Sequence, residues 1–256
     1  MKNAFVETGN VRRFQSALIA LERRGASEAC LMVVDGIPGL GKTTALKRWA
    51  TQSGVVYIRA KEEWTPSWFL NDLLAQFRIE PSSSYQKRYA QALEAMLKAQ
   101  SALTIQRRTF AVVIDEADHI SRSPRIMESV RDFSDLGDIV FVLVGMGKIR
   151  SNLTRFPQIA SRIAQYVRFE AASKADVRAF YDFLCEVPAA DDVVEFTLDV
   201  IKGLNREIME VLASVERIGR RNAASADKPV TLAMLAGQTV MNDRRTGEPV
   251  AVPGGL

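Results

Sequence analysis

The chain contains few of the residues that build disulfide frameworks and metal clusters. Among its 256 residues there are only two cysteines and one histidine. Cys30 falls on an expected buried strand and Cys185 on an expected helix, so we expect two reduced packing residues rather than a disulfide. The histidine, His119, has no cysteine or second histidine at ligand spacing. This favours a capping or supporting polar role over metal binding.

Long apolar runs and a large charge excess are missing as well. No stretch approaches the ~20 apolar residues that a membrane-spanning helix needs. Residues 1–7 lack the apolar segment and cleavage site of a secretory signal, so we expect a cytoplasmic protein. The formal net charge of +4 permits nucleic-acid binding without requiring it.

One short motif predicts nucleotide binding. Residues 36–43 read GIPGLGKT, which matches G-x-x-x-x-G-K-[ST] at every fixed position. In this motif the glycines let backbone amides surround phosphates, the lysine reaches the β and γ oxygens, and the threonine hydroxyl ligates Mg²⁺. An apolar segment precedes the motif and a helix is expected to follow it. The expected ATP-binding residues are Gly36, Pro38, Gly39, Gly41, Lys42, Thr43 and Thr44.

A pair of acids supplies the second half of a hydrolytic site. Asp115 and Glu116 follow an apolar segment, where P-loop enzymes place an aspartate that orients the metal and a glutamate near the attacking water. We therefore expect Thr43 and Asp115 to hold Mg²⁺, and Lys42, Asp115 and Glu116 to be catalytic. The tetrad 115–118 also spells a helicase signature, but such helicases need two domains of this kind and the chain has length for one.

The end of the fourth apolar segment predicts slow hydrolysis. Many ATPases of this build carry an asparagine, serine or threonine there, whereas residues 145–147 read Gly-Met-Gly. Met146 has no side-chain hydrogen-bond donor for a phosphate. Turnover, rather than nucleotide binding, is the property that this substitution affects.

Apolar segments alternate with helical patterns over the first two thirds of the chain. This order predicts an α/β fold with a five-stranded parallel sheet between helices. Asn10 is expected to cap an N-terminal helix, and Thr65 to cap a helix that starts at Pro66. After Ser173 only helical periodicity remains. The expected strands are 30–35, 55–59, 110–115, 139–145 and 166–169; the expected domains are an N-terminal helix (1–28), a P-loop ATPase core (29–171), an all-helical lid (172–241) and a flexible tail (242–256).

The motifs together resemble the AAA+ ATPases. The resemblance covers nearly the whole chain and rests on the phosphate loop, Asp115-Glu116, Ser161-Arg162 and Gly203-Leu204-Asn205-Arg206. Within that class, the segments 33–36, 61–66 and 153–162 look like those of the B transposition proteins of Mu-like phages and the TnsC target selectors. Those relatives bind ATP, polymerise on duplex DNA and deliver it to a transposase.

The resemblance implies roles for further residues. Arg162 would act on the nucleotide of a neighbouring subunit, with Arg155 as the alternative. Arg206 would contact the γ-phosphate, although the asparagine beside it is displaced by one place from the family pattern G-N-x-R. Loops after the second and third strands would hold DNA phosphates without reading sequence. The implied DNA-binding residues are Arg59, Lys61, Arg122 and Arg125; for Trp64 and Trp68, core packing is favoured over base stacking.

The resemblance thus implies an ATPase that binds double-stranded DNA without sequence preference, assembles with itself into a ring or filament, and serves as a target-selection factor for a transposase. Two alternatives stay open. One is a helicase loader with the same core. The other is a nucleotide-gated assembly switch with negligible turnover.

Overall fold

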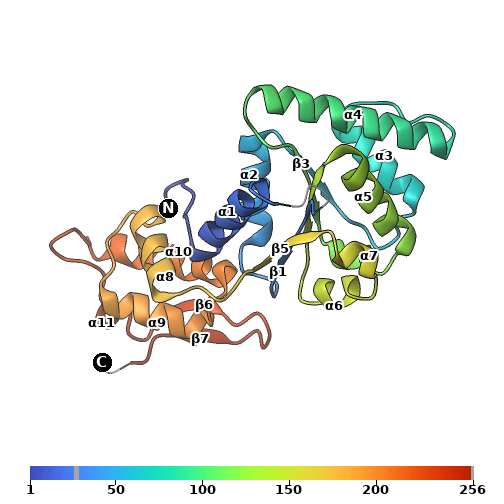
Figure 1. Cartoon of the computed structure of the whole chain (residues 1–256). Helices are drawn as coiled ribbons and strands as arrows, with labels where there is room; N and C mark the ends of the chain where they lie inside the picture. The colour runs from blue at the N-terminus through green and yellow to red at the C-terminus, as the bar shows by residue number, and fades with distance from the viewer. Residues whose placement is uncertain (26–28, 255–256) are drawn as a thin grey trace. The chain divides into compact units, whose positions relative to one another are not determined.

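The computed structural model describes residues 1–25 and 29–254 (Figure 1). The chain forms two compact units. The first unit comprises Met1–Arg12, Pro38–Gly41 and Glu170–Leu256, and the second comprises Arg13–Ile37 and Lys42–Phe169. Among the described residues, no helix is both long and apolar enough to cross a membrane.

The second unit is built on the predicted five-stranded parallel sheet, which is confirmed. Its strand order is β2-β3-β4-β1-β5, and every neighbouring pair is parallel. All residues of β3 and β4 are buried, as continuous apolar runs predict for strands covered on both faces. The strands are β1 (Leu31–Asp35), β2 (Val56–Arg59), β3 (Ala111–Asp115), β4 (Val140–Val144) and β5 (Ile163–Arg168).

Helices cover both faces of this sheet. Figure 1 shows α2 on one side of it, and α3, α4 and α5 on the other. The hydroxyl of Thr65 accepts a hydrogen bond from the Trp68 amide and Pro66 is the first helical residue, so the expected cap is confirmed. The helices are α1 (Gly9–Glu22, shared with the first unit), α2 (Lys42–Ser53), α3 (Pro66–Gln76), α4 (Tyr85–Ile105), α5 (Pro124–Gly137), α6 (Ile149–Leu153) and α7 (Pro157–Ala160).

The strand order positions the candidate functional residues. Because β4 lies between β1 and β3, the carboxyl end of β4 lies between the loop after β1 and the acid pair at the end of β3. All of these ends meet at one edge of the sheet, where open parallel sheets bind their ligands.

Beyond the start of α1, the described residues of the first unit form four helices and a small antiparallel sheet. Val177, Val194 and Leu212 are fully buried between the helices. Ser173 and Asp176 form a capping box at the start of α8. The elements are α8 (Lys174–Leu184), α9 (Asp191–Ile201), α10 (Asn205–Arg221), α11 (Leu232–Leu235), β6 (Thr239–Asn242) and β7 (Pro249–Ala251).

The β6–β7 hairpin differs from the expected all-helical lid and flexible tail. Val240 and Met241 of β6 are buried in the same core as the helices. In the turn, Asp243 accepts hydrogen bonds from the Arg245 and Thr246 amides at 2.8 and 3.2 Å. The two strands are too short to show an alternating apolar pattern. The sequence therefore indicates only the polar turn between them and does not predict the hairpin. The last two residues of the expected tail, 255–256, lie outside the described residues.

The N-terminal segment also differs from expectation. Helix α1 begins at Gly9, and Asn10 does not cap it. The Asn10 side chain instead exchanges two hydrogen bonds of 2.8 Å with the backbone N–H and C=O of Glu170. Residues 1–12 therefore group with the lid rather than forming a separate element, and the unit boundary falls at 169/170. The end of the expected N-terminal domain, 26–28, lies outside the described residues.

Candidate active site

The loop between β1 and α2 has the backbone conformation that its glycines allow. Gly39 and Gly41 have φ angles of +92° and +85°, which side-chain-bearing residues rarely adopt. A Cβ on Gly41 would lie 2.9 Å from Asn205 Nδ2. Helix α2 begins at Lys42, and the free amides at a helix N-terminus attract anions. The loop therefore fits a phosphate group.

Lys42 is buried beside this loop. Its ammonium donates to Gly36 O at 2.5 Å and to Ile37 O at 2.9 Å, and the residue is 7% exposed. Burial lowers the pKa of Lys42, while the nearby carboxylates of Asp35 and Asp115 oppose that shift. The lysine is thus already held at the loop where phosphate oxygens would bind.

Thr43 and Asp115 meet across a gap of 72 residues in sequence. The Thr43 hydroxyl donates to Asp115 Oδ2 at 2.8 Å. The Tyr57 hydroxyl donates to the same oxygen, and the Glu116 amide donates to Asp115 Oδ1 at 2.9 Å. Asp115 is 4% exposed. With its proton directed at Asp115, Thr43 keeps its lone pairs for a cation, and this hydroxyl–carboxylate oxygen set suits Mg²⁺.

Glu116 is held in a left-handed backbone conformation with φ +55°. Its carboxylate pairs with the Arg59 guanidinium, with Nη2 and Oε1 2.5 Å apart. His119 Nε2 lies 3.8 Å from the other oxygen, Oε2. His119 therefore neighbours the acid as a polar group, and no cluster of three or more histidine, cysteine or acidic residues among the described residues could hold a metal.

The residues after β4 are held by hydrogen bonds from their backbone amides to two aspartates. The Met146 amide donates to Asp118 Oδ2, and the Gly147 amide donates to Asp35 Oδ1 at 2.6 Å. The Met146 side chain is 40% exposed. Sequence reasoning did not assign a role to Asp35, although its position directly before the phosphate loop is a usable signal. Asp118, the last residue of the tetrad 115–118, acquires its partner only through the position of Met146 beside it.

The three candidate arginines lie in different environments. Arg162 pairs with Asp135 through Nε at 3.1 Å and Nη2 at 3.0 Å. The Arg155 side chain is exposed, and it has no hydrogen bond or ion pair to the residues that the structure describes. Within the first unit, the Arg206 amide donates to Gly39 O at 3.2 Å, so the start of α10 lies at residues 38–41.

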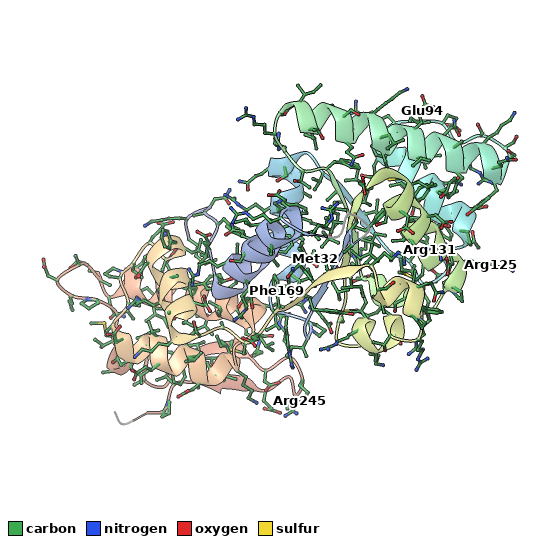
Figure 2. All side chains as sticks on the ribbon, viewed as in Figure 1. Met32, Glu94, Arg125, Arg131, Phe169 and Arg245 are labelled. Carbon is green, nitrogen blue, oxygen red and sulfur yellow. The ribbon has the colours of Figure 1, made fainter. Side chains whose placement is uncertain are left out.

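Most of the expected DNA-binding residues have intramolecular partners. Arg59 pairs with Glu116, and Lys61 pairs with Asp72 at 2.6 Å. Arg122 has one long contact with Asn152 at 3.5 Å. Arg125 is exposed at the outer end of α5 (Figure 2).

The two tryptophans in this region differ in exposure. Trp64 is 6% exposed and packs against Phe69, with ring centroids 5.5 Å apart, whereas Trp68 is 40% exposed. Both indole N–H groups donate to Asp72. Trp64 is therefore a core residue, as expected. Trp68 is not, because its ring lies at the surface.

Comparisons with known proteins agree with this geometry. A family model for the AAA domain matches residues 23–153, just over half of the chain. The chain is 25% identical over 183 residues to the Mu-like prophage FluMu DNA transposition protein B of Haemophilus influenzae. That match covers 69% of this chain and 60% of the relative, so the chain spans less than two thirds of the relative's length.

Solved structures share the fold. The Aeropyrum pernix ORC2 protein in ADPNP–ADP complexes matches with a TM-score of 0.60 and 18% identity, covering 89% of this chain and 68% of that one. The Aeropyrum pernix ORC1 protein in complex with DNA matches with a TM-score of 0.54 and 18% identity, covering 90% and 64%. A variant of RuvB from Thermotoga maritima matches with a TM-score of 0.55 and 14% identity, covering 89% and 67%.

The segment matched by the AAA family contains both halves of the candidate site, the loop at residues 36–43 and the acids Asp115 and Glu116. The sheet order, the loop geometry and the family match lead to the same assignment. The chain belongs to the AAA family of P-loop ATPases and is similar to the B transposition proteins of Mu-like phages.

Proposed function

We propose that this chain is an ATP-hydrolysing protein that assembles with itself on double-stranded DNA without sequence preference and presents that DNA to a transposase. The observation that carries the ATPase part is the 2.8 Å hydrogen bond that joins Thr43 of the phosphate loop to Asp115 of the acid pair. The printed name of the Haemophilus relative supports the transposition part. We place the activity in the cytoplasm of a bacterium or phage-infected host, because that relative is a prophage protein of a bacterium.

Phosphate binding would use groups that are already in place. The Lys42 ammonium would exchange the carbonyls of Gly36 and Ile37 for β- and γ-phosphate oxygens. Gly39, Gly41 and the start of α2, with Thr44, would supply backbone amides. Pro38 would take part only through its place in the loop, because proline has no N–H to donate.

Hydrolysis would need Mg²⁺ and a positioned water. Thr43 and Asp115 would hold the metal, which when bound neutralises charge that develops on the phosphates. Glu116 would orient the attacking water through a carboxylate oxygen. In the structure one of its oxygens is paired with Arg59, so Glu116 must rearrange or share that partner before it can act fully.

Two arginines would complete the charge balance of the transferred phosphate. Arg206 would contribute from its own chain, since its backbone already contacts Gly39. Arg162 would act on the nucleotide of a neighbouring subunit, and it would first have to leave Asp135. This requirement links catalysis to self-assembly.

DNA binding would use four basic residues at or after the carboxyl ends of β2 and β3. Arg59 is the last residue of β2, Lys61 follows it, and Arg122 and Arg125 follow β3. Contacts of such residues with phosphates carry no sequence information. Random duplex DNA should therefore bind the purified protein in the presence of ATP and Mg²⁺, with an affinity that falls steeply as salt rises. Absence of salt-sensitive binding, or equal binding by the Lys42→Ala variant, would refute the proposal.

A second candidate function is a nucleotide-gated assembly switch with negligible turnover. Two observations favour it, namely the ion pair that occupies Glu116 and the lack of a polar side chain at Met146. Both functions include ATP-dependent assembly. They differ only in whether Glu116 orients a water that hydrolyses the bound ATP.

A further inference from the structure

Tyr57 contacts the acid pair from the neighbouring strand. In β2 alternate residues point to the same face, so Tyr57 and Arg59 share one face of the sheet. Tyr57 is in register with Val113, and Arg59 with Asp115. The long aromatic side chain reaches the diagonal neighbour, and the Tyr57 hydroxyl donates to Asp115 Oδ2.

The Asp115 carboxylate has little acceptor capacity left. Oδ2 accepts from Tyr57 and from Thr43, and Oδ1 accepts from the Glu116 amide. A carboxylate offers about four acceptor positions. The remaining one is on Oδ1, so Tyr57 and Thr43 together determine which oxygen is offered to a cation.

The Tyr57 ring is itself fixed in place. The side chain is partly buried at this sheet edge. Lys47 of α2 places its ammonium 5.5 Å from the ring centroid. A phenol hydroxyl with its ordinary pKa of about 10 is protonated at neutral pH, so the Tyr57 hydroxyl is a donor to Asp115.

We propose that Tyr57 is a positioning residue for the Mg²⁺ site, which orients the Asp115 carboxylate so that Oδ1 alone is free for the metal or a water bound to it. This inference rests on the proposed ATP-binding function. Tyr57 does not bind the phosphates in this proposal, because Lys42 and the loop amides do so. Loss of its hydroxyl should weaken metal binding without weakening nucleotide binding that occurs in the absence of metal.

The test uses Tyr57→Phe, which removes one hydroxyl and keeps the ring. Binding of a fluorescent ATP analogue is measured over a Mg²⁺ titration and again in EDTA. We expect the Mg²⁺ concentration at half-saturation to rise about tenfold, the range typical for loss of a group that supports a metal ligand. Affinity in EDTA should equal that of the wild type, which also shows that the variant is folded.

Tyr166→Phe is the matched control. Tyr166 lies on β5, where its ring is 5.1 Å from the Arg150 guanidinium and its hydroxyl is outside the Asp115 network. This control should leave the Mg²⁺ midpoint unchanged. An unchanged midpoint in Tyr57→Phe, or an equal loss of affinity in EDTA, would overturn the inference. If the wild type fails to bind the analogue under all conditions, the nucleotide-binding function itself fails, and the positioning role with it.

Discussion

Arg59 and Glu116 form an ion pair with Nη2 and Oε1 2.5 Å apart, which joins a residue expected to contact DNA to the residue expected to position the attacking water. The Arg59 side chain is 67% exposed and that of Glu116 is 24% exposed. A DNA phosphate could therefore compete for Arg59 from solvent. If the chain has the proposed function, this pair would restrain hydrolysis without DNA and would release Glu116 when DNA binds.

Substitution of Arg59 tests this coupling. Arg59→Ala should raise ATP hydrolysis in the absence of DNA about threefold, because Glu116 no longer has to leave an exposed ion pair before it can act. It should also reduce the stimulation that DNA adds. Steady-state phosphate release with and without duplex DNA measures both. Arg125→Ala is the control for the basal rate alone, because Arg125 is exposed and has no side-chain partner among the described residues. A basal rate in Arg59→Ala equal to that of the wild type would contradict the coupling.

Glu116→Gln separates the enzyme from the assembly switch. The amide keeps the size of the side chain but cannot accept a proton or attract one from water as a carboxylate does. For an ATPase we expect hydrolysis to fall at least about 100-fold, while ATP-dependent assembly on DNA persists. Phosphate release and sedimentation measure the two properties. If the wild-type rate is already negligible and the variant changes nothing, the switch function holds instead.

Mixing two inactive variants tests whether Arg162 acts across subunits. Arg162→Ala should bind ATP but lose hydrolysis by about 10³-fold, the lower end of what such arginines contribute. Lys42→Ala should not bind ATP but still provides Arg162. A mixture should regain activity at interfaces where an intact nucleotide site meets an intact arginine. Repeating the experiment with Arg155→Ala shows which arginine is the one needed, and absence of any recovery in either mixture would exclude action between subunits.

The capping box at the start of α8 predicts that the stability of the fold falls in acid. Burial would raise the pKa of Asp176, but hydrogen bonds from the Ser173 and Gly9 amides and the Ser173 hydroxyl outweigh it, so the net shift is below the ordinary value of 3.8. A carboxyl with a lowered folded pKa stabilises the fold above its unfolded pKa, and this contribution is lost as pH falls through the folded pKa.

Asp176→Asn should therefore lose about 2 kcal/mol of stability at neutral pH, the value of hydrogen bonds to a charged group. Below about pH 4, the variant should also lose less additional stability than the wild type does. Urea denaturation at neutral and acidic pH measures both effects. Parallel stability curves for the two proteins over the whole pH range would show that Asp176 does not carry the acid sensitivity.

Much of the second unit follows from local sequence. Five apolar runs predict five strands, and the structure places each within a few residues of its expected bounds. The GIPGLGKT motif predicts a phosphate loop because glycine alone adopts the φ angles found at Gly39 and Gly41 without strain. These features depend on residues close together in the chain.

Other features depended on partners distant in sequence. Asn10 is a residue type favoured at helix caps, but its side chain hydrogen-bonds to Glu170. Part of the expected tail forms β7, which pairs with β6, and Val252 next to it is buried in the same core as the lid helices. The roles of Tyr57, Asp35 and Asp118 likewise depend on strand pairing, since each contacts a group on another strand or loop.

The strands, the phosphate loop and the acid pair can be predicted from the sequence, because apolar periodicity, glycine conformations and short motifs act locally. The contacts of Tyr57 with Asp115, of Arg59 with Glu116 and of Asp135 with Arg162 are visible only in the folded chain. These pairs arise from strand order and register, and a side chain acquires such a partner only after the sheet has brought separate segments together.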